Sequence, residues 1–273
     1  MDTPDLHPRG HSVLRSDANA GKIALVTGGG TGIGAATALE LARTGASLVI
    51  CGKREEPLAA VQREIEANGG SCLAIATDVR ELDQIETLVD AAVERFGAVD
   101  ILVNNAGGQF TAPAEAISPN GWRAVHRLAV DASWAITRLV AERSMIPQRS
   151  GVVVFIGFSP RRGIPGFAHA SSARAALENL ASGLSLEWSR YGIRSICVSP
   201  GTIATEGLDQ YGADLEEWAT GIPMRRLGTP SEVAAVIAFL CSPGGAYVTG
   251  TTVLVDGGAD AWGQAESPPP LER

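Results

Sequence analysis

The chain has 273 residues, of which 45% are hydrophobic, and a formal net charge of -8 at pH 7. This length and composition suffice for one large domain with a full core. The acidic balance argues against nucleic acid or an anionic membrane as a partner, and no run approaches the roughly 20 apolar residues of a membrane helix.

The two ends of the chain differ in composition from the rest. Residues 1–20 are polar and lack the apolar core of a secretory signal, and residues 263–273 contain three consecutive prolines. We therefore expect a flexible leader, a domain over residues 21–262 and a flexible tail. The four cysteines lie far apart without Cys-x-x-Cys spacing, which indicates reduced, mostly buried thiols and a cytoplasmic protein.

Apolar runs alternate with helical stretches along the domain. Strands are predicted at residues 22–27, 46–51, 72–76, 100–103, 152–156, 195–198 and 252–255. Helices are predicted at residues 35–44, 55–67, 81–96, 119–145, 171–190 and 230–240. This order implies one doubly wound Rossmann-type α/β domain, with a seven-stranded, mostly parallel sheet and helices on both faces. The long irregular stretch at 205–228 is typical of a lid or binding segment.

A glycine-rich turn follows the first strand and opens the first helix. In it, Gly28 permits a tight turn, Gly32 lets the backbone approach a pyrophosphate, and Gly34 allows close helix packing. The helix N-terminus offers N–H groups and a positive dipole to phosphates. The predicted nucleotide site includes Gly28, Gly30, Thr31, Gly32, Ile33 and Gly34.

The second strand is followed by Lys53 and Arg54, and residues 46–54 contain no acid. An NAD site usually carries an Asp or Glu at this place, whereas basic residues suit the 2′-phosphate of NADP. The pair therefore predicts NADP(H) as the cofactor. The alternative is that both side chains are solvated loop charges.

Four motifs resemble the short-chain dehydrogenase/reductase family: Thr-Gly-x-x-x-Gly-x-Gly at 27–34, Asn-Asn-Ala-Gly at 104–107, Pro-Gly-Thr-Ile-Ala-Thr at 200–205 and Val-Asp-Gly-Gly at 255–258. They occur in the family's order over about residues 21–260. The resemblance implies that the adenine lies against Asp78 and Val79 and that backbone of Ile203 meets the carboxamide. Further cofactor contacts are implied for Asn105, Ala106, Gly107, Arg174, Pro200, Gly201 and Thr205.

The family's usual tetrad of Asn, Ser, Tyr and Lys is substituted at every position. The register places Arg174 at the Lys position, Ala170 at the Tyr position and Ala129 at the Asn position. The Ser position falls on Phe158, with Ser159 just beyond. An arginine, with a pKa above ~12, does not titrate but can hold ribose hydroxyls. We therefore predict a complete cofactor site without the usual proton donor for keto–alcohol interconversion.

Residues 107–122, His169 and the Ala-Arg-Ala at 173–175 resemble the peroxisomal trans-2-enoyl-CoA reductase and 2,4-dienoyl-CoA reductase branch. This implies conjugate reduction of an enoyl thioester, which needs oxyanion stabilisation and a proton that water can bring. The candidate catalytic residues are Arg174, Ser159 as a donor to a substrate carbonyl, and His169 as a substitute acid.

Three functions stay open at this point. The first is an NADP(H)-dependent reductase of an enoyl-thioester-like double bond, and the second is a carbonyl reductase or dehydrogenase with a substitute acid. The third is a catalytically silent or non-redox nucleotide-binding protein. Apolar residues such as Leu208, Tyr211, Leu215 and Trp218 indicate an acyl or cyclic ligand, for example an acyl-CoA. The arginines at 161–162 either meet the phosphates of such a CoA or are solvated charges. The resemblance also implies a homotetramer or homodimer.

Overall fold

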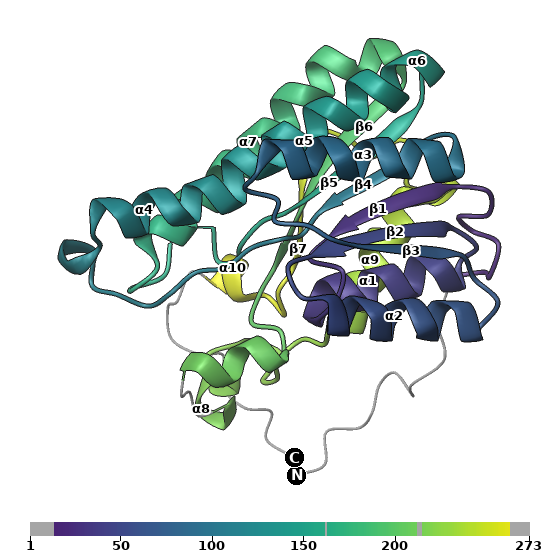
Figure 1. The fold of residues 1–273 in the computed structure, drawn as a ribbon. Helices are drawn as coiled ribbons and strands as arrows, with labels where there is room; N and C mark the ends of the chain where they lie inside the picture. The colour runs from purple at the N-terminus through teal and green to yellow at the C-terminus, as the bar shows by residue number, and fades with distance from the viewer. Residues whose placement is uncertain (1–13, 162, 212–214, 263–273) are drawn as a thin grey trace, which may run out of the picture.

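The computed structural model describes residues 14–161, 163–211 and 215–262, without the side chains of residues 209–217. In this part of the chain, strands form one sheet of order β3-β2-β1-β4-β5-β6-β7, and all neighbouring strands are parallel (Figure 1). The strands are β1 Ile23–Thr27, β2 Ser47–Gly52, β3 Cys72–Ala76, β4 Ile101–Asn104, β5 Gly151–Ile156, β6 Ile193–Pro200 and β7 Thr252–Val255. The order reverses between β1 and β4, so a crevice opens at their carboxyl ends, where ligands bind in such folds.

Helices cover both faces of the sheet, as predicted (Figure 1). One face carries α1 Gly32–Arg43, α2 Glu55–Ala67 and α9 Pro230–Cys241, and the other carries α3 Leu82–Phe96, α5 Ala132–Val140 and α7 Ala168–Trp188. Successive strand residues point to opposite faces of the sheet. In β1, Val26 packs in the core beneath α1, α2 and α9, and Leu25 packs in the core beneath α3, α5 and α7. Burial on both faces explains why the strands are nearly continuous apolar runs.

Helix starts follow the expected capping chemistry. Thr229 and Glu232 form a capping box at the start of α9, with Pro230 in the first turn. The Ser118 hydroxyl accepts from the Gly121 N–H at the start of α4. Both helices begin at the predicted residues, 119 and 230.

The predicted helix over residues 119–145 is continuous but irregular. It comprises α4 Pro119–His126, a π-helical turn at Arg127–Asp131, α5, a second π turn at Ala141–Met145, and α6 Ile146–Gln148. Each π turn shifts the helix face, a feature that periodicity over a long window does not reveal. The stretch predicted to be irregular contains a 3₁₀ helix at Glu206–Tyr211 and α8 Leu215–Thr220, so that prediction was wrong in part.

The domain begins before residue 21, which corrects the predicted leader. Asn19 is buried, and its Nδ2 donates to Thr44 Oγ1 at 2.9 Å and to the Ala238 carbonyl at 3.2 Å. Leu14 packs on the core beneath α1 and α9. Leu14 and Asn19 therefore contact the domain, whereas residues 15–17 and 20 between and beside them are exposed. Residues 1–13 and the predicted tail at 263–273 lie outside the described chain.

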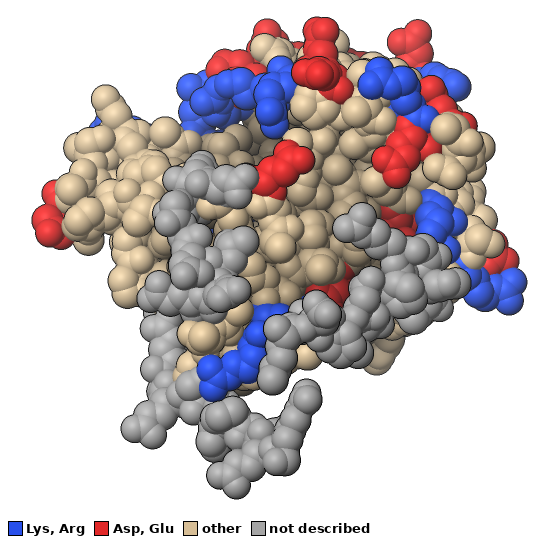
Figure 2. Space-filling model, turned by 90° about the horizontal axis from the view of Figure 1, so that it is seen from below, with Lys and Arg blue, Asp and Glu red and all other residues tan. Residues whose placement is uncertain are grey.

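All four cysteines are buried and free, as predicted. Burial raises the pKa of each thiol, including that of Cys197, to about 12, so none is a nucleophile near neutral pH. On the face shown in Figure 2, basic and acidic side chains of the described residues lie interspersed. Among the described helices, none combines the length and apolar character needed to cross a membrane.

Candidate active site

A cavity of about 860 Å³ lies at the carboxyl edge of the sheet. Segments from the glycine turn, the ends of β4 and β5, α7 and the chain after β6 line it. A smaller cavity of about 160 Å³ shares Gly28, Ala106 and Gly107 with it. Of the residues predicted from sequence, the large cavity contains Gly28, Thr31, Gly32, Ile33, Arg54, Asn105, Ala106, Gly107, Ser159, Arg174, Pro200, Gly201, Ile203 and Thr205. The small one adds Lys53, Asp78 and Val79.

The glycine turn has the geometry that the motif predicts. Gly28 and Gly32 have φ of 65° and 54°, in the left-handed region that favours glycine. A Cβ on Gly34 would lie 2.1 Å from the Gly28 carbonyl oxygen, so only glycine fits between the turn and α1. The Thr31 side chain does not cap α1, which leaves N–H groups of the first helical turn for an anion.

Gly30 packs against the start of α2, and its predicted place in the nucleotide site stays a prediction. It is not among the cavity-lining residues. A Cβ there would lie 3.1 Å from Pro57 Cβ and 3.2 Å from the Leu58 nitrogen. Gly30 therefore lets the glycine turn pack closely on the start of α2.

The residues after β4 are hydrogen-bonded to the residues at the start of the glycine turn. Thr27 Oγ1 accepts from the backbone N–H groups of Asn105 and Ala106, both at 2.9 Å. In return, Asn105 Nδ2 donates to the Thr27 carbonyl at 2.8 Å and to that of Gly28 at 3.2 Å. The Asn-Asn-Ala-Gly motif thus holds the turn in place, which gives the motif a structural reason.

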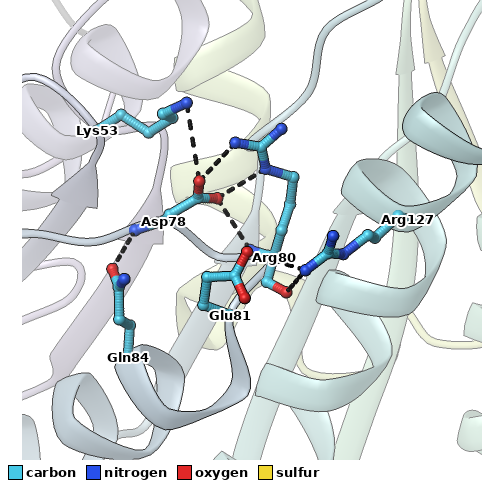
Figure 3. A network of polar contacts seen from close by, with 6 residues as sticks. All are labelled: Lys53, Asp78, Arg80, Glu81, Gln84 and Arg127. Atoms are coloured by element: carbon cyan, nitrogen blue, oxygen red, sulfur yellow. Dashed lines mark hydrogen bonds and ion pairs between the residues drawn. The ribbon is translucent and has the colours of Figure 1, made fainter. Parts of the chain in front are cut away.

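The small cavity contains an ionic network, drawn in Figure 3. Arg80 binds both oxygens of Asp78, with Nη2 at 2.5 Å from Oδ2 and Nε at 2.8 Å from Oδ1. Lys53 Nζ lies 3.7 Å from the same carboxylate. The Arg80 guanidinium holds the pKa of Asp78 far below its usual range. The neighbouring Val79 is buried, so the cavity pairs an apolar contact with a firmly ionised carboxylate.

The same network reaches the π turn that interrupts the helix after α4. Arg127 Nη2 donates to the Arg80 carbonyl and to Glu81 Oε1, both at 2.9 Å (Figure 3). Gln84 Oε1 accepts from the Asp78 N–H at 2.8 Å. The loop after β3 is therefore fixed from three directions.

Arg174 is a buried cation inside the large cavity. Only 9% of the residue is exposed, and Nη1 donates to the Ile156 carbonyl at 2.7 Å. A Cβ on Gly107 would lie 2.0 Å from Nη2, so glycine at 107 makes room for the guanidinium. Burial lowers the pKa of Arg174 from its ordinary 12.5. Among the described residues, no ion pair includes it, and a buried charge in this state needs compensation from a ligand.

Ser159 lines the cavity, but its hydroxyl is engaged. Ser159 Oγ donates to Asp256 Oδ2 at 2.5 Å, and its N–H donates to the Pro200 carbonyl at 3.0 Å. Because the hydroxyl hydrogen is given to a carboxylate, the expected free donor to a substrate carbonyl is not present in this geometry.

His169 is fully buried and is not among the residues that line the cavity. Its ring packs on Phe110 with centroids 4.2 Å apart. Burial lowers the pKa of His169, and the Phe110 backbone opposes this shift only in part. This placement gives no support to the predicted role as a substitute acid.

The positions assigned to the Tyr, the Asn and the Ser of the tetrad are apolar, in contrast to Arg174 at the Lys position. Ala170 is 2% exposed, and Ala129 is 3% exposed within the π turn, where it clusters with Val125 and Ala173. Phe158 lines the cavity, and its ring centroid lies 6.1 Å from that of Phe167. None of these side chains can donate a proton.

Several cavity residues were not found by sequence reasoning. Gln109, Ile164, Pro165 and Phe167 line the cavity. Gln109 belongs to the segment 107–122 that resembles the enoyl-CoA reductase branch, but no spacing marked it as a site residue. Its neighbours Gly107 and Gly108 are exposed, so water reaches this side of the cavity.

Two of the four apolar residues from which an acyl or cyclic ligand was predicted lie at the cavity, and the ligand itself stays a prediction. Leu208 and Trp218 line the cavity, whereas the side chains of Tyr211 and Leu215 lie outside the description. Arg161 binds Asp260 while its side chain stays 44% exposed, so the choice between a solvated charge and a phosphate contact stays open for this residue. Residue 162 lies outside the described chain.

Comparisons with known proteins agree with this geometry. A family model described as enoyl-(acyl carrier protein) reductase matches residues 28–260. The chain is 32% identical over 243 residues to a probable 2,4-dienoyl-CoA reductase of Bacillus subtilis, covering 87% of this chain and 96% of that one. It is 35% identical over 265 residues to a peroxisomal 2,4-dienoyl-CoA reductase of Pongo abelii, covering 95% and 90%.

Solved structures give the same result. A citronellol catabolism dehydrogenase of Pseudomonas aeruginosa superposes with a TM-score of 0.82 at 36% identity, over 91% of this chain and 99% of that one. A gluconate 5-dehydrogenase of Burkholderia cenocepacia, solved with NADP and tartrate, gives 0.84 at 33% identity over 90% and 98%. With its parallel sheet, glycine turn and matched length, the chain belongs to the short-chain dehydrogenase/reductase family and is an oxidoreductase.

Proposed function

We propose that this oxidoreductase uses NADP(H) to reduce an activated carbon–carbon double bond, with an enoyl thioester as substrate. The observation that carries the proposal is the contrast between the charged Arg174 and the apolar residues at the other tetrad positions. A buried, permanent cation lies in the cavity, while the positions of the acid and its relay are apolar.

The residues present fit a dinucleotide. Any Cβ at position 34 would fill the space beside the glycine turn. Arg174 is a buried donor that lacks a counter-ion among the described residues. The glycine turn and the N-terminus of α1 would hold the pyrophosphate. Asp78 and Val79 would border the adenine, and Arg174 would hold ribose hydroxyls. Bound NADPH would supply the hydride.

The charges beside the small cavity favour NADPH over NADH. Lys53 and Arg54 follow β2, where they can meet a 2′-phosphate. The carboxylate nearby, Asp78, has both oxygens bound by Arg80 and is not free to accept from a ribose hydroxyl. An NADP-bound structural relative supports the same assignment for this chain.

Conjugate reduction matches what this chain can supply. When hydride adds to the β-carbon, negative charge develops on the thioester oxygen and must be stabilised by a fixed donor. Arg174 offers a charge that does not titrate near neutral pH, and Gln109 offers a neutral donor on the cavity wall. The α-carbon then takes a proton from water, which reaches the exposed edge at Gly107 and Gly108.

The cavity wall suits an acyl chain. Phe158, Ile164, Phe167, Leu208 and Trp218 line it. Two relatives are 2,4-dienoyl-CoA reductases, and together with this wall they support an acyl-CoA as the substrate.

The test is product analysis with labelled cofactor. Incubation of a trans-2-enoyl-CoA with NADPH deuterated at C4 should give the saturated thioester with deuterium at the β-carbon, and NADH should serve less well. Absence of any saturated product, with NADPH binding intact, would favour the silent or non-redox alternative. Faster turnover with NADH would overturn the cofactor assignment.

Assembly and location stay predictions. Trp134 on α5 and Leu186 on α7 are 42% and 81% exposed, and they support self-association as a homodimer or homotetramer. Sedimentation velocity measures this directly, and a mass of one chain would contradict it. Cell fractionation tests the predicted cytoplasmic location.

A further inference from the structure

Two carboxylates near the C-terminus bind the cavity wall that follows β5. This wall, which comprises residues 157–161 and 163–167 of the described chain, contributes Phe158, Ser159, Ile164 and Phe167 to the large cavity. The carboxylates are Asp256, directly after β7, and Asp260, in α10 Ala259–Trp262. Neither residue is among those that line the cavity.

Asp256 accepts three hydrogen bonds. Its Oδ2 accepts from Ser159 Oγ at 2.5 Å and from the Asp260 N–H at 2.9 Å, and its Oδ1 accepts from the Gly258 N–H at 2.9 Å. It therefore connects the wall at Ser159 with the turn that leads into α10.

Asp260 provides the second connection. It is 5% exposed, and its Oδ1 accepts from the Arg161 N–H at 2.7 Å. Its Oδ2 accepts from Arg161 Nε and Nη2 at 3.2 and 3.0 Å. A carboxylate that is bound by both backbone and guanidinium of one residue fixes the main chain as well as the side chain.

The backbone beneath these contacts leaves little room for adjustment. A Cβ on Gly201 would lie 2.8 Å from the Asp256 Cα, and the Gly201 N–H donates to the Val255 carbonyl at 3.0 Å. The carboxylate of Asp256 is thus held on the sheet while its contacts reach out to the wall.

We propose that Asp256 and Asp260 are positioning residues that set the shape of the substrate side of the cavity by holding this wall. The inference rests on the proposed function for the identity of the substrate, although the positioning itself can be measured without turnover. Ser159 then acts as a structural contact for Asp256 rather than as a donor to substrate.

The principal test compares Asp260→Asn with a matched control, Asp90→Asn. Asp90 also pairs with an arginine, Arg143, but neither lines the cavity. Asp260→Asn should raise KM for the enoyl thioester about tenfold, because loss of one charged contact of this kind corresponds to about that factor. NADPH affinity should stay within about twofold of wild type, and kcat should change less than KM. Asp90→Asn should leave all three values unchanged.

Two further variants make the reading specific. Arg161→Met should match Asp260→Asn, and the double variant should be no worse than either alone, since both remove one contact. Ser159→Ala should raise KM modestly; a large loss of kcat with unchanged KM would instead identify Ser159 as a donor and overturn this assignment. Equal falls in kcat, substrate affinity and NADPH affinity for Asp260→Asn would also overturn it.

Amide hydrogen exchange separates this inference from the proposed function. Asp260→Asn should speed exchange of amides within this wall, and Asp90→Asn should not. If wild type reduced no enoyl thioester while this local effect was present, the proposed function would fail and the positioning would stand. Unchanged exchange within the wall would refute the positioning whatever the substrate.

Discussion

The two halves of the cavity are built from different chemistry. On the β1–β4 side, backbone atoms and glycines determine the geometry, and Gly28, Gly34 and Asn105 contact one another closely. On the β5–α7 side, apolar side chains surround a single buried cation, Arg174, and the wall is held by carboxylates outside the cavity. A fold can therefore keep its cofactor half intact while the half that handles protons changes.

The largest effect is expected in the cofactor half. Gly34→Ala should destabilise the protein by about 3 kcal/mol and abolish NADPH binding, because its Cβ would lie 2.1 Å from the Gly28 carbonyl oxygen. Gly183→Ala on α7 is the control, since a Cβ there meets nothing within 4 Å. It should stabilise the helix by about 0.5–1 kcal/mol. Thermal melts and NADPH titration measure both, and normal NADPH affinity in Gly34→Ala would break the comparison.

The second effect tests the substrate half. Arg174→Met should lower kcat/KM by about 100-fold or more, as for loss of one oxyanion donor, and should also weaken NADPH binding, because the same guanidinium would hold ribose hydroxyls. The wild-type rate should be independent of pH between about 6 and 9, because an arginine side chain does not deprotonate in this range. A rate that rises or falls through a single ionisation near neutral pH would show that another residue supplies the acid.

The fold class was predicted from the sequence, and most residues predicted for the cofactor site line the two cavities, because glycine turns and strand ends leave local patterns. Sequence reasoning missed the packing of Gly30, which depends on how closely α2 approaches, and the contacts of Asp256 and Asp260. Those arise from residues about 100 positions apart in the chain, and spacing holds no information about them. His169 looked available beside Ala170 but is buried under Phe110, which only packing reveals.

A moderate effect is expected if the relay residue is restored. Ala129→Asn should destabilise the fold by about 1–3 kcal/mol, because Ala129 is buried against Val125 and Ala173. It should not create ketone reduction, since no proton donor stands at Ala170. Denaturant unfolding gives the first quantity and a 3-oxoacyl substrate the second; a gain of ketone reduction would show that the relay alone was lacking.

The smallest effect concerns protein stability, to which His169 and Glu232 contribute in two different pH ranges. Burial places the folded-state pKa of His169 below its ordinary 6.5, so its contribution to stability is complete above about pH 6.5 and is lost as pH falls through the folded value. The pKa of Glu232 is lowered to about 2 by Arg226, so its contribution is lost only between about 4.5 and 2. His169→Gln should reduce the pH dependence of the free energy of unfolding in the first range, and Glu232→Gln should reduce it in the second. Urea unfolding at pH 7.5, 5.5 and 3 measures both. An unchanged pH dependence of His169→Gln in the first range would contradict the assignment.

The most direct measurement compares two substrates of equal chain length with the same enzyme. NADPH oxidation should be followed with a trans-2-enoyl-CoA and with the corresponding 3-oxoacyl-CoA, because only the second requires a proton donor at the substrate oxygen. The account predicts kcat/KM at least about 100-fold higher for the enoyl thioester, the order of magnitude that general acid catalysis contributes. Equal or faster reduction of the 3-oxoacyl thioester would contradict it.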